Sequence, residues 1–153
     1  MIIDARNEFC DAIALNTGGA GTYLLGSQID TGAAGSLASA NNDHLYLVIT
    51  VDTLPTSANS TATATFTLAS DASAAVATDG SASVHLVTKA FSISEMAAGT
   101  VLYCGKLPYS AAEPYEQYLG ILQTTGTQAF TAGKINAFLT ADPAAWAATP
   151  DAL

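Results

Sequence analysis

His44-Leu45-Tyr46-Leu47-Val48-Ile49-Thr50-Val51 is a continuous run in which six of eight residues are apolar or aromatic, and its second half is β-branched. No charged side chain interrupts it. Such a run predicts a strand that is buried on both faces, and it is too short to span a membrane. Asn41-Asn42-Asp43 precedes it and Pro55 follows it. Because proline has no amide hydrogen to donate to a sheet ladder, the strand is bounded on both sides.

The next segment, residues 61–68, alternates threonine with an apolar residue at every position. A period of two predicts a strand with one hydroxyl face and one buried face. Further β-prone runs lie at 22–25, 84–91, 100–104, 118–123 and 134–140. Seven or eight strands with little helix predict an antiparallel two-sheet β-sandwich, either a jelly roll or an immunoglobulin-like domain. Long loops at 30–43 and 71–83 favour the jelly roll.

A chain of 153 residues is long enough for one hydrophobic core. We expect an extended N-terminal arm at 1–20, the sandwich at 21–142 and a C-terminal extension at 143–153. Within the arm, Phe9 and Ile13 stand at helical spacing, which leaves its local structure weakly determined. Asp142-Pro143 predicts the start of a short helical turn, which Pro150 ends.

Four basic residues against 13 acidic ones give a formal net charge of −9. This balance excludes binding driven by contacts to nucleic-acid phosphates and disfavours an anionic membrane surface. The N-terminus has no secretory signal, so we expect synthesis in a host cytoplasm. Cys10 and Cys104 are far apart and have no metal-ligand spacing. A buried pair of free thiols is therefore favoured over a disulfide.

The sequence contains few groups that could perform chemistry. A nucleophile needs a nearby base, and the only histidines, His44 and His85, stand among apolar neighbours. Glu113 and Glu116 could form a carboxylate pair, but they are better explained as solvated surface groups. No histidine, cysteine or carboxylate spacing typical of a metal site is present. We therefore expect no enzyme activity, no metal and no cofactor.

Aromatic residues late in the chain are candidates for contacts with a partner. Tyr109 and Tyr115 flank a proline-containing loop, and Trp146 lies in the C-terminal extension. Aromatic side chains at the edge of a sandwich can anchor a protein partner or stack on a sugar. Packing within this protein's own core or rim is the alternative.

Four stretches resemble the small jelly-roll capsid cement (decoration) proteins of tailed bacteriophages. They are Met1-Ile2-Ile3-Asp4 with Phe9 and Asp11-Ala12, then 45–52, then Thr65-Phe66-Thr67-Leu68 with Ser70-Asp71, and finally Phe130-Thr131-Ala132-Gly133-Lys134 with Ala137 and Asp142. The order and spacing of these stretches along a chain of this size carry the resemblance. The alanine-rich loops and the segment after Pro143 depart from the pattern.

The resemblance implies a structural virion protein on the outer surface of an icosahedral phage head. Its partners would be the major capsid protein and itself, as a homodimer, with a trimer as the alternative. The predicted capsid contacts are in the arm: Ile2, Ile3, Asp4, Arg6 and Phe9. Alternatively, Ile2 and Ile3 complete this protein's own sheet edge. A carbohydrate-binding or adhesin-type module that uses Tyr109, Tyr115 and Trp146 is the alternative function.

Overall fold

The computed structural model describes residues 5–34, 45–108 and 113–143. Within these residues lie nine strands and two short 3-10 turns, Ala5–Asn7 and Ile93–Glu95. The strands are β1 (Glu8–Ala14), β2 (Gly21–Asp30), β3 (Tyr46–Ser57), β4 (Thr63–Asp71), β5 (Ser83–Val87), β6 (Phe91–Ser92), β7 (Val101–Lys106), β8 (Tyr118–Gly126) and β9 (Phe130–Thr140).

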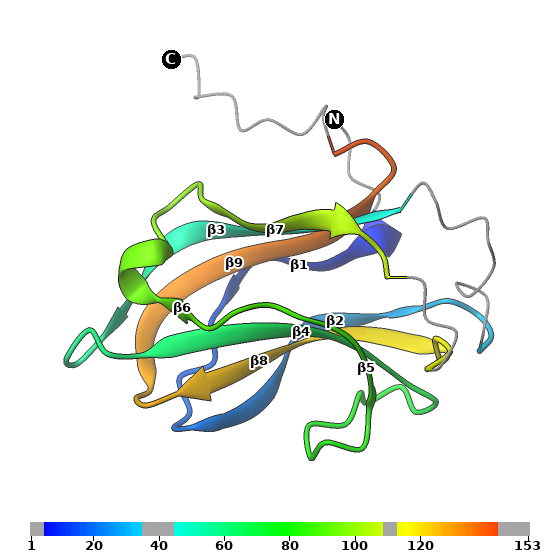
Figure 1. The fold of residues 1–153 in the computed structure, drawn as a ribbon, viewed down its shortest axis with the longest axis horizontal. Helices are drawn as coiled ribbons and strands as arrows, with labels where there is room; N and C mark the ends of the chain where they lie inside the picture. The colour runs from blue at the N-terminus through cyan, green and yellow to red at the C-terminus, as the bar shows by residue number, and fades with distance from the viewer. Residues whose placement is uncertain (1–4, 35–44, 109–112, 144–153) are drawn as a thin grey trace.

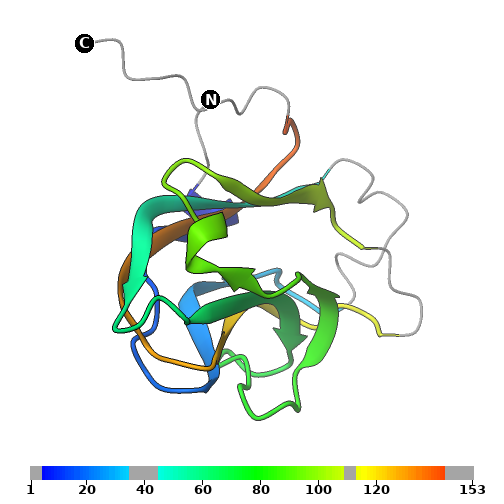
Figure 2. The same cartoon turned by 60° about the vertical axis from the view of Figure 1, so that its left-hand side comes forward.

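The strands form two antiparallel sheets that pack face to face (Figures 1 and 2). Sheet A has the order β1-β9-β3-β7, and sheet B has the order β2-β8-β4-β5, with β6 pairing to β4. The chain therefore pairs from the middle outwards, β4 with β5, β3 with β7, β2 with β8 and β1 with β9. This is the winding of a jelly roll, which confirms the predicted fold class.

The two strands with the clearest sequence patterns behave as predicted. β3 lies inside sheet A between β9 and β7, and residues 47–51 are buried on both faces. In β4, Ala64, Phe66 and Leu68 are fully buried in the core between the sheets, whereas Thr63 and Thr65 point to the other face and are half-buried. The apolar layer between the sheets is thus supplied by alternate residues of opposed strands.

The predicted boundary of the N-terminal arm is wrong. Residues 8–14 form β1, which pairs with β9 at the edge of sheet A. Phe9 and Cys10 both point inwards, because the register between β1 and β9 shifts on either side of Cys10. Ala12 has a φ of 46°, a backbone conformation typical of a bulge. The sandwich therefore begins at β1 and not at residue 21.

One other local prediction was only partly correct. The strand expected at 84–91 ends at Val87, and a separate short strand, β6, follows at Phe91. A 3-10 turn at Ile93–Glu95 then begins after Ser92. The predicted C-terminal helical turn lies outside the described residues. None of the helical turns in the described ranges is long and apolar enough to cross a membrane.

Candidate functional site

Five of the eight residues predicted to make contacts lie outside the described residues. They are Ile2, Ile3, Asp4, Tyr109 and Trp146. The other three are Arg6, Phe9 and Tyr115, and the structure gives them different surroundings.

Arg6 lies at the surface in the turn Ala5–Asn7, next to one end of the sandwich. It lines an open hollow of about 360 Å³ together with Asp30, Leu45 and Leu139. The hollow combines a guanidinium, a carboxylate and apolar side chains from both sheets. The side chain of Arg6 is thus exposed at the rim of this hollow.

Phe9 is only 1% exposed and packs in the core between the two sheets. Its side chain cannot reach a partner surface while β1 is paired, so the prediction that Phe9 contacts the capsid is wrong. Phe9 and Ile13 stand at helical spacing in the sequence but do not share a face, because Phe9 is buried and Ile13 is 39% exposed.

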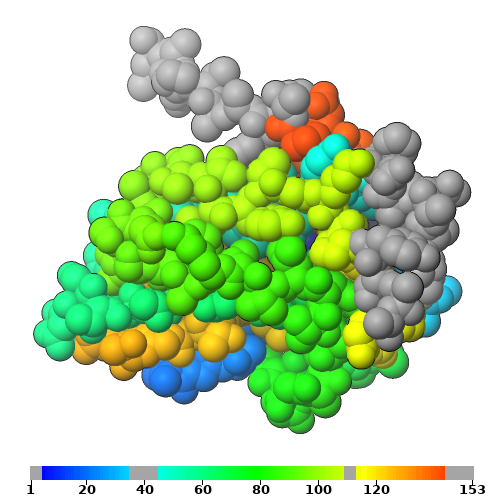
Figure 3. Space-filling model, in the orientation of Figure 1, coloured from blue at the N-terminus to red at the C-terminus, as the bar shows by residue number. Residues whose placement is uncertain are grey.

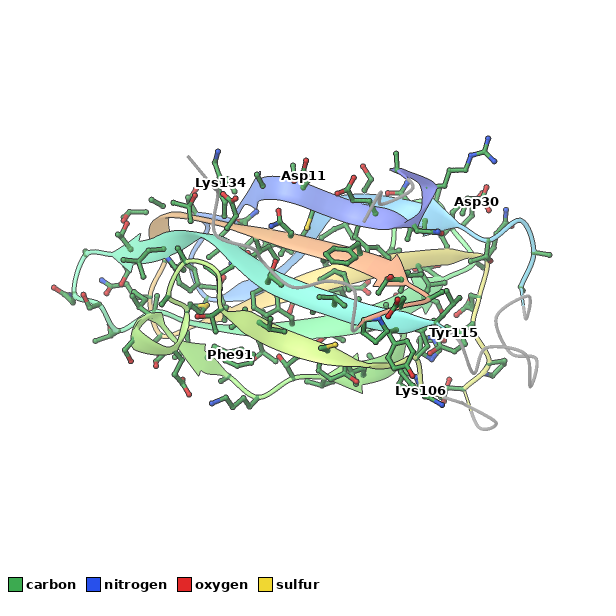
Figure 4. All side chains as sticks on the ribbon, turned by 90° about the horizontal axis from the view of Figure 1, so that it is seen from above. Asp11, Asp30, Phe91, Lys106, Tyr115 and Lys134 are labelled. Carbon is green, nitrogen blue, oxygen red and sulfur yellow. The ribbon has the colours of Figure 1, made fainter. Side chains whose placement is uncertain are left out.

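Tyr115 is also buried, with 1% of its surface exposed, so the prediction of a surface contact is wrong for this residue as well. Its hydroxyl donates a hydrogen bond of 2.8 Å to the carbonyl oxygen of Pro108. Burial raises its pKa to about 12. Figure 4 shows Tyr115 at the same end of the sandwich as Asp30 and Lys106, away from Lys134.

The ring of Tyr115 stacks on the imidazole of His85, with 3.9 Å between the ring centroids. His85 is the extra residue of a bulge in β5, because Leu86 pairs with Leu68 whereas Val84 pairs with Ala69. The bulge turns the imidazole towards β4, where its Nε2 lies 2.7 Å from the Oγ of Ser70. No sequence pattern indicated this cluster, because Ser70, His85 and Tyr115 lie on three separate segments of the chain.

The face of sheet B that points away from the core carries hydroxyl and valine side chains. We call it the threonine–valine face, and it consists of Thr22, Thr65, Thr124, Val84 and Val87. Thr124 stands between Thr22 and Thr65 on the neighbouring strands, and the hydroxyl oxygens of Thr22 and Thr124 are 3.0 Å apart. Val84 and Val87 are 48% and 58% exposed on the edge strand β5. Figure 3 shows segment 83–106 at the surface on one side of the sandwich.

This face is almost free of charge. The four main strands of sheet B contain only two ionised side chains, Asp30 and Asp71, and both lie beside Tyr118 in the last row of the sheet. Sheet A, by contrast, carries charges of both signs on β1, β3, β7 and β9. In a chain with a net charge of −9, sheet B therefore offers a surface that a partner can cover with little desolvation of charge.

A loop between β4 and β5 folds over part of the same sheet. Val76 and Ala82 of this loop pack on Leu122 and Ala69 and form a small second core outside the sandwich. Between the loop and the threonine–valine face lies a hollow of about 150 Å³, lined by backbone, threonine and apolar side chains. A long loop was predicted here from the sequence, but its packing on the sheet was not predicted.

Neither cysteine forms a disulfide. Cys10 is buried and Cys104 is exposed, so the predicted buried pair is correct only for Cys10. Burial raises the pKa of the Cys10 thiol to about 12, which makes it a poor metal ligand and nucleophile. Among the residues that the structure describes, no three histidine, cysteine, aspartate or glutamate side chains come together as a metal site would require.

Comparison with known proteins gives one family. No curated protein matches the chain. A family model named Bbp16 matches residues 17–139, which covers β2 to β9 of the sandwich except for the last residue of β9. The Bbp16 family is a capsid-associated protein family of phage, known from Bordetella phage BPP-1. Because the match spans well over half of the sequence, this chain belongs to the Bbp16 family.

Proposed function

We propose that this protein is a capsid cement protein, which binds the outer surface of an icosahedral phage head and stabilises contacts between subunits of the major capsid protein. The observation that carries this proposal is the match to a capsid-associated phage family over the body of the jelly roll. The proposal includes no enzymatic step and no cofactor.

Cement action follows from linked equilibria. A protein that binds an assembled shell but not its separated subunits stabilises the shell by RT ln(1 + [L]/Kd) per site, about 2.7 kcal/mol at a hundredfold excess over Kd. If one unit of this protein, as a homodimer, contacts two neighbouring subunits, the second contact is intramolecular and gains from a high effective concentration. The modest free energies of many such contacts then add up over the closed shell.

The threonine–valine face is the surface that we expect to lie on the shell. It has exposed apolar side chains on an edge strand and hydroxyl groups that can pair with backbone groups of a partner. Charged residues are depleted at the centres of protein interfaces, because removing them from water costs free energy. The outer face of sheet B meets this requirement, and its two carboxylates lie at its margin.

The arm is the second expected contact. Arg6 is exposed at the start of the described chain and could pair with a carboxylate of the shell. Ile2, Ile3 and Asp4 remain part of this proposal, whereas Phe9 does not. A deletion of residues 1–4, which ends before β1, would separate the contribution of the arm from that of sheet B.

Co-sedimentation of the purified protein with phage heads tests the proposed function. We expect saturable binding to mature shells that lack this protein, and weaker binding to dissociated capsid subunits. Bound shells should also dissociate at a higher temperature than bare shells. Absence of binding to mature shells, or equal binding to free subunits and shells without stabilisation, would refute the proposal.

The alternative function, a carbohydrate-binding or adhesin module, is not favoured by any observation on the described residues. The aromatic residues predicted to stack on a sugar include Tyr115, but Tyr115 is buried and hydrogen-bonded to Pro108. Binding of the isolated protein to a glycan array would revive this alternative.

A further inference from the structure

The segment 113–117, which leads into β8, is anchored by the buried ring of Tyr115 and by hydrogen bonds on two sides. On one side, the carbonyl oxygen of Gln117 accepts bonds of 2.9 and 2.8 Å from the amide and hydroxyl of Thr31. On the other side, the backbone amide of Glu116 donates a 2.9 Å bond to the Oγ of Ser70. The Ser70 hydroxyl is also within hydrogen-bond distance of His85, so His85 contributes to this second attachment.

Ser70 has no exposed surface, and its hydroxyl lies between His85 and the backbone of Glu116. The Oγ already accepts a bond from the Glu116 amide, and its own proton has an acceptor at 2.7 Å in the Nε2 of His85. When the Ser70 hydroxyl donates to Nε2, the imidazole is neutral and carries its proton on Nδ1. Within the described part of the chain, the buried Nδ1 has no hydrogen-bond partner.

Protonation of His85 would disturb the cluster in two ways. Nε2 would become a donor to the Ser70 oxygen, so the Ser70 proton would lose its acceptor. The positive charge would also sit on a half-buried ring that is stacked on Tyr115, with an Nδ1 proton that lacks an acceptor. An unpaired buried charge is more costly than an unpaired neutral group, so the closed arrangement favours the neutral ring.

Two carboxylates favour the protonated form of His85 and so raise its pKa. Glu113 and Glu116 come from the same segment that packs on His85, and both favour the imidazolium. The Glu116 carboxylate accepts a 2.7 Å bond from the hydroxyl of Ser83. Burial has the larger effect, and the net result is that the pKa of His85 lies below its ordinary value of about 6.5.

We propose that His85 is an acid-sensitive latch: its neutral form holds the segment Glu113–Gln117 against β4 and β5, and its protonation releases that segment. This device does not depend on the proposed binding to phage heads. A histidine whose pKa is lowered in the closed state stabilises that state fully above the open-state pKa, and this stability is lost as the pH falls through the closed-state pKa. Each pKa unit of difference makes opening about tenfold more favourable in acid.

Hydrogen–deuterium exchange of the whole protein tests the latch. Exchange is followed in peptides that cover 113–117, between about pH 7.5 and about pH 5, with labelling times corrected for intrinsic exchange. We expect protection of this segment to fall in acid, by about tenfold for each pKa unit that separates the open and closed states, while peptides from β3 and β9 keep theirs. Protection that is unchanged, or that increases because a charged His85 pairs with Glu113 or Glu116, would overturn the proposal.

His85→Gln is the matched variant, because glutamine can donate and accept hydrogen bonds but does not titrate in this range. We expect its 113–117 segment to show no pH dependence, and the same dependence as in the wild type would overturn the proposal. If the variant does not fold, the titration of His85 in the wild type, followed by NMR, decides the question. A pKa at or above the ordinary histidine value would exclude the latch.

Discussion

Gly26 in β2 lies against the backbone of Phe9 in β1, so closely that a Cβ atom on Gly26 would stand 2.1 Å from the Phe9 carbonyl oxygen. This approach closes the side of the sandwich where the first strands of the two sheets meet. Gly26 also has a φ of 64°, which glycine adopts at little cost.

Substitution Gly26→Ala should therefore lower the free energy of unfolding by about 2 to 4 kcal/mol, because it combines a strained φ with a backbone clash. Gly32→Ala is the matched control. Gly32 has a φ of 83° and no atom within 4 Å of an added Cβ, so it should lose only about 1 kcal/mol. Urea unfolding followed by circular dichroism measures both, and equal losses would contradict the close packing of β1 on β2.

Phe9 and Arg6, which the sequence grouped as capsid contacts, should have separate effects. Phe9→Ala removes a fully buried ring and should cost about 3 to 5 kcal/mol of stability. Arg6→Ala alters an exposed turn and should change stability by less than about 1 kcal/mol while weakening attachment to phage heads. Thermal unfolding and co-sedimentation distinguish the two variants. A stable Phe9→Ala protein would show that β1 does not belong to the core.

The two thiols should differ in reactivity. Cys104 is exposed and should react quickly with a maleimide at neutral pH, whereas Cys10 is buried and its pKa of about 12 leaves it protonated there. Mass spectrometry should detect one label on the native protein and two after denaturation. Cys104→Ser should abolish the fast reaction. Fast labelling of Cys10 in the folded protein would contradict the position of β1.

Lysine at Val84 and Val87 should weaken binding to phage heads by about tenfold or more, because each charge would have to be desolvated or paired at the interface. Val101→Lys is the matched control, since Val101 is similarly exposed, at 46%, but lies on β7 of sheet A. All variants should fold as well as the wild type. If the double variant binds phage heads as tightly as the wild type does, the proposed face is wrong, although the proposed function stands.

The jelly roll could be predicted from sequence because its strands carry strong local patterns. The threonine alternation in β4 and the apolar run in β3 each reflect burial on a defined face, and burial imposes a period of two or a continuous apolar run. In β9, Ile135 and Leu139 face the core while Phe138 faces the other way, as the alternation predicts.

β1 could not be predicted from the same rule, because its bulge places Phe9 and Cys10 on the same face and so removes the period of two. The burial of Tyr115 was equally hidden. It depends on His85, which reaches Tyr115 only through a second bulge, and on Pro108. Sequence patterns report regular strands, whereas these contacts arise where regular pairing is interrupted.

An electron cryo-microscopy reconstruction of mature phage heads that contain this protein is the most direct test of the proposal that it cements the capsid. We expect density for a two-layer β-sandwich on the outer surface, repeated with the symmetry of the shell, with the outer face of sheet B against the major capsid protein. Heads whose outer surface carries no such density, while the protein is found elsewhere in the virion or not at all, would contradict the proposed function.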